Sequence, residues 1–207
     1  MTNDGPLHAS QIFESRAFDD LDVSGERFVG KEFFRCTFKN LRAGESTFEK
    51  CQFEKCVFDE CDLTRCCLSH TSLHGVEFRG SKLLGVNFSQ ANKNVDISFS
   101  DCVLRYAVFD GMALRDTRFS DCQLQDAQFQ KTDLVNADFT GSDLAQTVFD
   151  GCELSGADFS NARAFLLDPR ANRVRDAYVS ADTAAALVHA MGFRVAGYHS
   201  RAKRIRR

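Results

Sequence analysis

The sequence predicts an all-β solenoid, in which the chain winds into four-sided coils and ends in a short C-terminal helix. Three observations predict this fold: a five-residue hydrophobic period, a second small residue in every unit, and a ten-residue alternation of Phe and Leu in the second half. A short fixed period is typical of solenoids, whose units bury their apolar side only against neighbouring units.

The five-residue period is the first observation. Every fifth residue from Phe13 to Phe88 is apolar, and the series resumes one residue out of phase from Phe99 to Phe159. Seventeen of the twenty Phe residues fall on these marks, so the period decides where the large side chains lie. We call the marked residue of each unit its centre.

A small or apolar residue, such as Cys36, Cys56 or Ala137, stands two positions before most centres. Spacing by two puts both side chains on one side of an extended backbone, and the residue between them points outward. The last two residues of the unit must turn a corner. Each unit therefore forms one side of a coil.

The alternation of Phe and Leu gives the number of sides. From Phe99 to Phe159 Phe recurs every ten residues, so a four-sided coil of 20 residues stacks the Phe residues in two opposite columns. A three-sided coil would scatter them, which close packing disfavours. The predicted columns are Phe99, Phe119, Phe139 and Phe159 on one side and Phe109, Phe129 and Phe149 on the other.

The chain divides into four predicted segments. Residues 1–10 form a flexible lead-in, and residues 11–163 form the β-helix. The period loses its phase at residues 89–98, where Lys93 would be a centre and cannot be buried, so one side of the coil is expected to bulge there. Residues 164–199 form a cap and dimerisation segment, and residues 200–207 form a basic tail.

The C-terminal segment contains the one predicted helix. Asp168-Pro169 indicates a turn, and Ser180 is the expected N-cap of a helix that Gly192 ends. A two-fold dimer would bury its apolar stripe; the alternative is that the helix only caps the coil of its own chain. The candidate interface residues are Leu187, Val188, Met191 and Phe193.

Composition excludes several classes of protein. No run approaches the roughly 18 apolar residues of a membrane span, and the start lacks a basic and apolar signal segment, so we expect a cytoplasmic protein without membrane contact. Residues 11–163 carry 25 acidic and 17 basic side chains, whereas residues 164–207 carry 3 and 9. An acidic rod is not expected to bind nucleic acid directly.

No catalytic or cofactor site is evident. The sequence lacks a phosphate-binding Gly loop, a nucleophile elbow and a His-Glu-x-x-His motif, so an enzyme and a bound cofactor are not expected. Eight of the nine Cys residues fall on inward positions and are expected to act as small buried hydrophobes. Cys66, Cys67, His70 and His74 could ligate zinc by type, but their side chains diverge in this register, so we expect no metal.

The units resemble the pentapeptide-repeat family, whose pattern is Ala, Asp or Asn, then Leu or Phe, and two variable residues. The best matches begin at Ala137, Ser142 and Ala157. The resemblance implies a right-handed quadrilateral β-helix. The Phe-rich centres, the Cys-rich first stack and the segment after Asp168 are similar to the topoisomerase-protecting branch, which includes the Qnr and albicidin-immunity proteins.

This resemblance implies a DNA mimic that binds DNA gyrase, with topoisomerase IV as a further candidate, and protects it from a poison or toxin. Seven or so coils at ~4.8 Å give a rod of ~35 Å, and a dimer ~70–90 Å. The alternative is a non-catalytic scaffold that binds another protein along a flat face. The candidate topoisomerase contacts are Asp133, Asp138, Asp143 and Asp158, with Asn92, Lys93 and Asn94 at the phase break.

Overall fold

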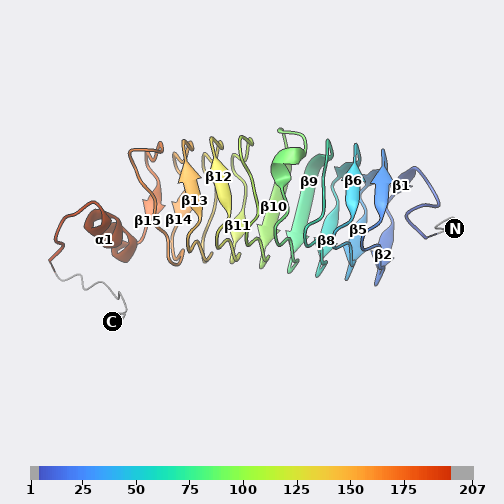
Figure 1. The fold of residues 1–207 in the computed structure, drawn as a ribbon, viewed down its shortest axis with the longest axis horizontal. Helices are drawn as coiled ribbons and strands as arrows, with labels where there is room; N and C mark the ends of the chain where they lie inside the picture. Colours follow the sequence, from blue (N-terminus) through green and yellow to red (C-terminus); the bar gives the residue numbers. More distant parts are fainter. Residues whose placement is uncertain (1–4, 197–207) are drawn as a thin grey trace.

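The chain winds into a rod of stacked coils (Figure 1), and the computed structural model describes residues 5–196 of it. Residues 1–4 and 197–207 lie outside the described part, and with them the predicted basic tail at 200–207. The two ends of the described chain lie at opposite ends of the rod, and the helix α1 lies at the C-terminal end.

Most sides of a coil are short strands or single β-bridges. The strands are β1 (Ile12–Glu14), β2 (Ala17–Asp19), β3 (Arg27–Val29), β4 (Glu32–Phe34), β5 (Thr37–Lys39), β6 (Thr47–Glu49), β7 (Gln52–Glu54), β8 (Val57–Asp59), β9 (Ser72–Arg79), β10 (Asp96–Ser100), β11 (Phe119–Ser120), β12 (Gln128–Gln130), β13 (Val148–Asp150), β14 (Asp158–Phe159) and β15 (Tyr178–Val179). The helices are the 3₁₀-helix η1 (Phe88–Gln90) and α1 (Ala181–Ala190).

Each strand pairs in parallel with the strand one coil away. Phe13 lies opposite Phe33 and Phe18 opposite Phe38, so one coil takes 20 residues and has four sides. The predicted right-handed quadrilateral β-helix is confirmed.

We name the four faces by their buried centres. Face A holds Phe13, Phe33, Phe53, Leu73, Leu114, Leu134 and Leu154. Face B holds Phe18, Phe38, Phe58, Phe78, Phe99, Phe119, Phe139 and Phe159. Face C holds Val23, Ala43, Leu63, Leu83, Leu104, Leu124 and Leu144. Face D holds Phe28, Phe48, Leu68, Phe88, Phe109, Phe129 and Phe149.

The eight rings of face B form an unbroken stack through the rod. Successive ring centroids from Phe18 to Phe159 lie 4.6–5.2 Å apart and nearly parallel. The rings of face D meet them edge to face, for example Phe109 against Phe119 at 5.5 Å. Offset stacks and edge-to-face contacts are the geometries that aromatic rings prefer. Both predicted Phe columns are therefore confirmed.

The extra residue at the phase break is absorbed outside the core. Phe78 stacks on Phe99 at 5.2 Å although 21 residues separate them, and the pairing of β9 with β10 shifts between Asp96 and Ile97. Lys93 is exposed, because the chain bends away from the coil after η1. The break changes the surface and leaves the face B stack continuous.

The corner residue two positions after each centre is left-handed at most corners. On the corner between faces B and C, for example, φ is 54° at Asp20, 51° at Asn40 and 54° at Glu60. Asn, Asp and Gly adopt this conformation most readily, and β-branched residues are strained in it. None of the left-handed corners within residues 5–196 carries a β-branched residue, and most carry a polar residue or Gly on the edge of the rod.

The repeat fold continues past residue 163, where the five-residue pattern ends. Phe165 stacks on Phe159 at 4.1 Å, and β15 pairs with β14. Asn172 takes the small inward position, accepting from the Cys152 N–H and donating to the Phe149 carbonyl. Asn172 thus continues the coil with the same hydrogen bonds that the smaller Ser142 makes at this position.

The described part of the predicted lead-in is packed. Leu7 is buried, and the His8 ring lies 4.8 Å from Phe28 and bonds to Glu26 at 2.8 Å. These residues cover the open N-terminal end of the core. Leu7 lies outside the five-residue period, so the pattern could not reveal its burial.

The helix α1 begins where Ser180 accepts a hydrogen bond from the Thr183 N–H, which confirms the predicted N-cap. It ends before Gly192, whose φ is 95°. Leu187 packs against the core.

We predict that Leu124→Asp destabilises the protein by more than about 4 kcal/mol, because it buries an unpaired carboxylate. Leu124 is fully buried on face C, and its neighbour Gln123 is exposed. Thermal melting of the two variants gives the test. Gln123→Asp should melt within a few degrees of wild type; equal melting of both variants would show that the face C register is wrong.

Candidate interaction surface

Charge is distributed unevenly along the rod. The N-terminal half (residues 11–88) carries 13 acidic and 11 basic side chains, a net charge of −2. The C-terminal half (residues 97–163) carries 11 acidic and 5 basic side chains, a net charge of −6. Most of the excess negative charge of the rod therefore lies in the half next to α1.

Ion pairs between neighbouring coils neutralise the N-terminal half. Arg42 pairs with Asp22 at 3.0 Å and Arg65 with Glu45 at 3.6 Å, each across one coil. Similar cross-coil contacts join Arg27 to Glu49, Arg35 to Glu14 and Lys39 to Asp59. Opposite charges stacked on adjacent strands are favourable and like charges are not, so these pairs also favour the correct stacking of coils.

The edge between faces B and C shows the alternation most clearly. Along this edge, a coil with acidic side chains is followed by a coil with basic side chains. The successive sets are Asp19, Asp20 and Asp22; Lys39 and Arg42; Asp59, Glu60 and Asp62; Arg79 and Lys82.

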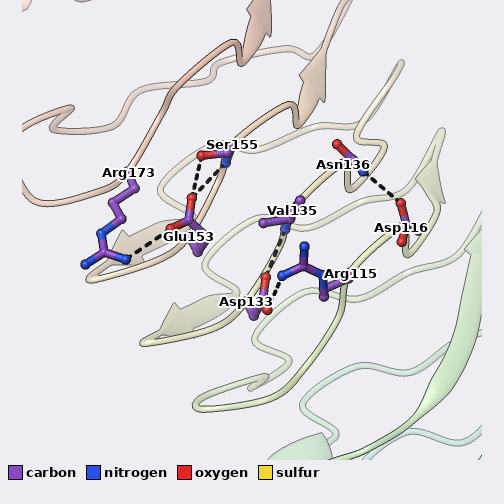
Figure 2. Close-up of polar contacts among 8 residues, drawn as sticks. All are labelled: Arg115, Asp116, Asp133, Val135, Asn136, Glu153, Ser155 and Arg173. Atoms are coloured by element: carbon purple, nitrogen blue, oxygen red, sulfur yellow. Dashed lines mark hydrogen bonds and ion pairs between the residues drawn. The ribbon is translucent and has the colours of Figure 1, made fainter.

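The alternation stops in the C-terminal half. Within residues 97–163 only two carboxylates have an ion-pair partner: Asp133 pairs with Arg115 at 2.9 Å, and Glu153 pairs with Arg173. On face A the carboxylates have local partners (Figure 2): Glu153 lies 3.3 Å from Arg173 of the next coil, and Asp116 accepts from Asn136 at 3.0 Å. The unpaired carboxylates therefore lie elsewhere.

Five carboxylates on face B and the adjacent part of face C form what we call the acidic surface. Its residues are Asp101, Asp121, Asp138, Asp143 and Asp158. Asp138 and Asp158 lie opposite each other on neighbouring coils. None of the ion pairs within residues 5–196 involves any of the five. Two basic residues of the C-terminal half border this surface: Arg118 lies opposite Asp138 on face B, and Arg163 lies opposite Asp143 on face C.

Backbone hydrogen bonds hold three of these carboxylates in place. Oδ1 of Asp138, Asp143 and Asp158 accepts from the N–H two residues later, at 2.9, 3.1 and 2.7 Å. An Asn at the same position has an oxygen that accepts the same bond. The contact explains why Asp or Asn precedes a centre. The second oxygen, Oδ2, of Asp138 accepts from the Ser120 hydroxyl at 3.3 Å, whereas Oδ2 of Asp143 and of Asp158 has no hydrogen bond within residues 5–196.

The sequence-predicted contacts fall on three faces. Asp138 and Asp158 lie on face B and Asp143 on face C, whereas Asp133 lies on face A beside Arg115. Residues 92–94 are exposed, and Asn94 pairs with Ala113 on face A. The structure thus brings three of the four predicted aspartates into one surface and separates Asp133 and the phase-break residues from it.

Sequence reasoning missed Asp101 and Asp121, because they occupy corners and not the position before a centre. A signal for them exists in the 20-residue register. The corner between faces B and C contains only acidic residues, Asn and Gly: Asp20, Asn40, Glu60, Gly80, Asp101, Asp121, Gly141 and Asn161.

The predicted dimer residues lie at the C-terminal end of the rod. Leu187 is half-buried, while Val188, Met191 and Phe193 are 40%, 51% and 61% exposed. A groove beside them is lined by six apolar residues and by the ion pair of Asp168 with Arg170; the apolar residues are Leu166, Leu167, Pro169, Leu187, Ala190 and Met191. Apolar side chains therefore gather at this end.

The cysteines lie mainly inside the rod. Eight are buried and Cys67 is partly exposed. Burial raises the pKa of the Cys66 thiol to about 12 and that of Cys56 and Cys61 to about 11, which keeps these groups protonated. Within residues 5–196 no group of three or more His, Cys, Asp and Glu side chains is arranged to hold a metal ion.

In the same described part, the longest helix is too short to cross a bilayer, and no membrane-spanning helix is found.

Comparison with known proteins shows similarity in sequence pattern and in fold. Residues 31–97 and 94–159 match the family described as the pentapeptide repeat region. No curated protein sequence matches the chain.

Two solved structures of trypsin-treated QnrB1 variants, described as a plasmid-mediated fluoroquinolone resistance protein, resemble the chain. They are 19% and 20% identical, with TM-scores of 0.60 and 0.58, and cover 90% of this chain and 98% of their own. HetL from the cyanobacterium Nostoc sp. strain PCC 7120 is 16% identical, covers 83% of this chain and 88% of its own, and has a TM-score of 0.48. At these identities the likeness to QnrB1 shows a common fold.

We predict that one thiol per native chain reacts readily with an aromatic disulfide reagent at pH 8, because Cys67 is partly exposed and the other eight Cys side chains are buried out of reach of the reagent. All nine should react after unfolding in guanidinium. Cys67→Ser should remove the single fast reaction. Rapid labelling of several thiols in the folded protein would contradict the inward placement of the other eight.

Proposed function

The chain belongs to the pentapeptide-repeat family, which is generally non-catalytic, and we propose that it is a DNA mimic that binds a bacterial type II topoisomerase. DNA gyrase is the first candidate and topoisomerase IV the second. Binding would protect the enzyme from a gyrase-poisoning antibiotic or toxin, in the cytoplasm, where the enzyme meets its DNA. The fold that the chain shares with QnrB1, a fluoroquinolone resistance protein, supports this choice of partner.

The acidic surface is the observation that carries the proposal. DNA-binding enzymes present basic channels to a regularly charged polyanion, and complementary charge steers association. In the C-terminal half the carboxylates of Asp101, Asp121 and Asp158 are unpaired. Asp101 and Asp121 lie one coil apart, as do Asp138 and Asp158, so each pair repeats with the coil spacing of ~4.8 Å on the parallel stack.

The distribution of apolar side chains supports a mimic more than a scaffold. A scaffold that binds along a flat face would present a contiguous apolar patch. On the rod, the exposed large apolar side chains Ile12, Val29, Tyr106 and Val148 are scattered: Ile12 lies on face A, Tyr106 at a corner, and Val29 and Val148 near opposite ends of face D. They form no contiguous patch.

Asp133 and the exposed residues Asn92, Lys93 and Asn94 complete the proposed contact set, as a second contact along face A. The acidic surface and face A share the C-terminal half of the rod. A channel that surrounds the rod would meet both.

We further propose that the protein is a homodimer through its C-terminal end, with Leu187, Val188, Met191 and Phe193 in the interface. A two-fold interface would bury the apolar groove of both copies. Because the acidic surface lies in the half next to α1, this dimer would bring the two acidic surfaces toward the centre of a longer rod.

We predict that this protein lowers the fraction of DNA cleaved by gyrase in the presence of a fluoroquinolone. Replacing Asp101, Asp121, Asp138, Asp143 and Asp158 together with Asn should raise the Kd for gyrase about tenfold or more at low salt, since several weak charge contacts are lost together. Asn retains the backbone hydrogen bonds, so the fold should be kept.

The matched control changes five carboxylates of the N-terminal half: Asp19→Asn, Asp20→Asn, Asp59→Asn, Glu60→Gln and Asp62→Asn. Its net charge changes equally, but it should bind gyrase within about threefold of wild type, because cross-coil pairs already neutralise that half. Equal loss in both variants would mean that net charge alone matters. If neither gyrase nor topoisomerase IV binds at low salt, the mimic proposal is wrong.

We predict that Met191→Glu with Phe193→Glu converts the dimer to a monomer in sedimentation velocity, because the interface would have to bury two carboxylates. Ile12→Glu with Val29→Glu changes two exposed apolar residues at the other end and should leave the dimer intact. These substitutions are cleaner than truncation after Ala164, which would also remove Phe165 and β15 from the fold. A wild-type monomer at micromolar concentration would refute the dimer.

A further inference from the structure

An exposed tyrosine continues the column of acidic residues on face B. Tyr178 is 69% exposed and belongs to β15, which pairs with β14 so that Tyr178 lies directly opposite Asp158. Asp158 in turn lies opposite Asp138. Side chains opposite each other on neighbouring strands have Cβ atoms only about 5 Å apart. The column therefore runs Asp138, Asp158, Tyr178 along one face.

The Asp158 carboxylate is oriented but not neutralised. Its Oδ1 accepts from the Ser160 N–H at 2.7 Å, which fixes the side chain on face B. No ion pair within residues 5–196 includes Asp158. The outward residues that follow Asp158 and Tyr178 on face B are uncharged: Ser160, Asn161 and Ser180. On the corner that precedes Tyr178, Arg175 and Asp176 neutralise each other at 3.6 Å.

A carboxylate beside an exposed phenol ring suits a guanidinium group. Arginine donates paired hydrogen bonds to a carboxylate and stacks its planar group on an aromatic face, whereas lysine is a compact, strongly hydrated charge that does neither as well. Within residues 5–196 one such contact between a guanidinium and a tyrosine ring already exists: Arg105 lies 5.6 Å from the centre of the Tyr106 ring. Tyr178 has no such partner among the described residues.

We propose that Asp158 and Tyr178 form a binding site for an arginine side chain on a basic protein surface. The inference rests on the proposed function, in which that surface is the DNA-binding channel of a topoisomerase, and it adds a specific contact to a binding mode otherwise built from separate charges. The carboxylate attracts the guanidinium, and the ring covers its apolar face. Tyr178 acts as an aromatic anchor at the end of the acidic surface, the kind of residue that dominates interface energies.

The test compares five variants of the full chain with wild type for gyrase binding at low salt. Tyr178→Ala and Asp158→Asn should each raise the Kd for gyrase about tenfold. Tyr178→Phe keeps the ring, so its Kd should stay within about twofold of the wild-type value. Tyr106→Ala is the matched control for the ring, because Tyr106 is also exposed but already covered by Arg105. It should leave binding unchanged.

The control for the carboxylate is Asp133→Asn. Asp133 holds the same position in its unit and the same kind of backbone hydrogen bond, to the Val135 N–H at 3.2 Å, but it pairs with Arg115. Its replacement removes the same charge and should weaken binding less than Asp158→Asn does.

A second readout needs no topoisomerase. Wild type should bind a short arginine peptide several-fold more tightly than a lysine peptide of equal length. Binding is measured from the NMR signals of the tyrosine rings. The preference should disappear in Tyr178→Ala and persist in Tyr106→Ala. An arginine preference in wild type without gyrase binding would overturn the proposed function and support the site itself.

Three results would overturn the inference. Gyrase binding by Tyr178→Ala and Asp158→Asn equal to wild type would refute the site while leaving the proposed function intact. Equal binding of the arginine and lysine peptides would refute the guanidinium preference. A change from dimer to monomer in Tyr178→Ala would place this residue in the self-interface instead.

Discussion

The stacking of Phe rings on face B is the constraint on which the rest of the structure depends. From Phe18 to Phe159 one ring lies on the next at 4.6–5.2 Å, and the column passes the phase break without interruption at Phe78 and Phe99. Close packing allows little change in the volume of a buried column, so the extra residue of the break has to leave the core. The core thus fixes the rise of the coils and the register of every outward position.

Because the register is fixed, the charged side chains on the surface are arranged in columns that run along the rod. Each outward side chain has the residue of the next coil directly beside it, at about the strand spacing of ~4.8 Å. In the N-terminal half the sign alternates along such columns, as from Asp22 to Arg42, and ion pairs form. In the C-terminal half Asp138 and Asp158 follow each other without a cation between them. One backbone therefore presents a neutralised half and an acidic half.

The same geometry explains how the acidic half keeps its charge in a fixed arrangement. Like charges on adjacent strands repel, so flexible carboxylates would turn away from each other. Here the N–H groups of Thr140 and Ser160 hold Asp138 and Asp158 at the face. The repulsion costs stability, which the buried rings and the parallel ladders offset. An oriented array of this kind is what a basic channel would recognise, and it ends at an exposed ring, Tyr178.

The sequence by itself determined the coil. Its five-residue period and its alternation of Phe and Leu predicted four sides, the two Phe columns and the inward cysteines, because these features depend on local spacing that every coil repeats. Only the tertiary structure determined how the chain packs in the segments that lack the five-residue period. Asn172 continues the coil through hydrogen bonds, and Leu7 closes its first end, although neither follows the apolar pattern. It also decided which carboxylates are free. Asp133 and Asp158 occupy the same place in their units, but Arg115 comes close to Asp133 only after the coils stack, since ion pairing depends on residues about one coil away.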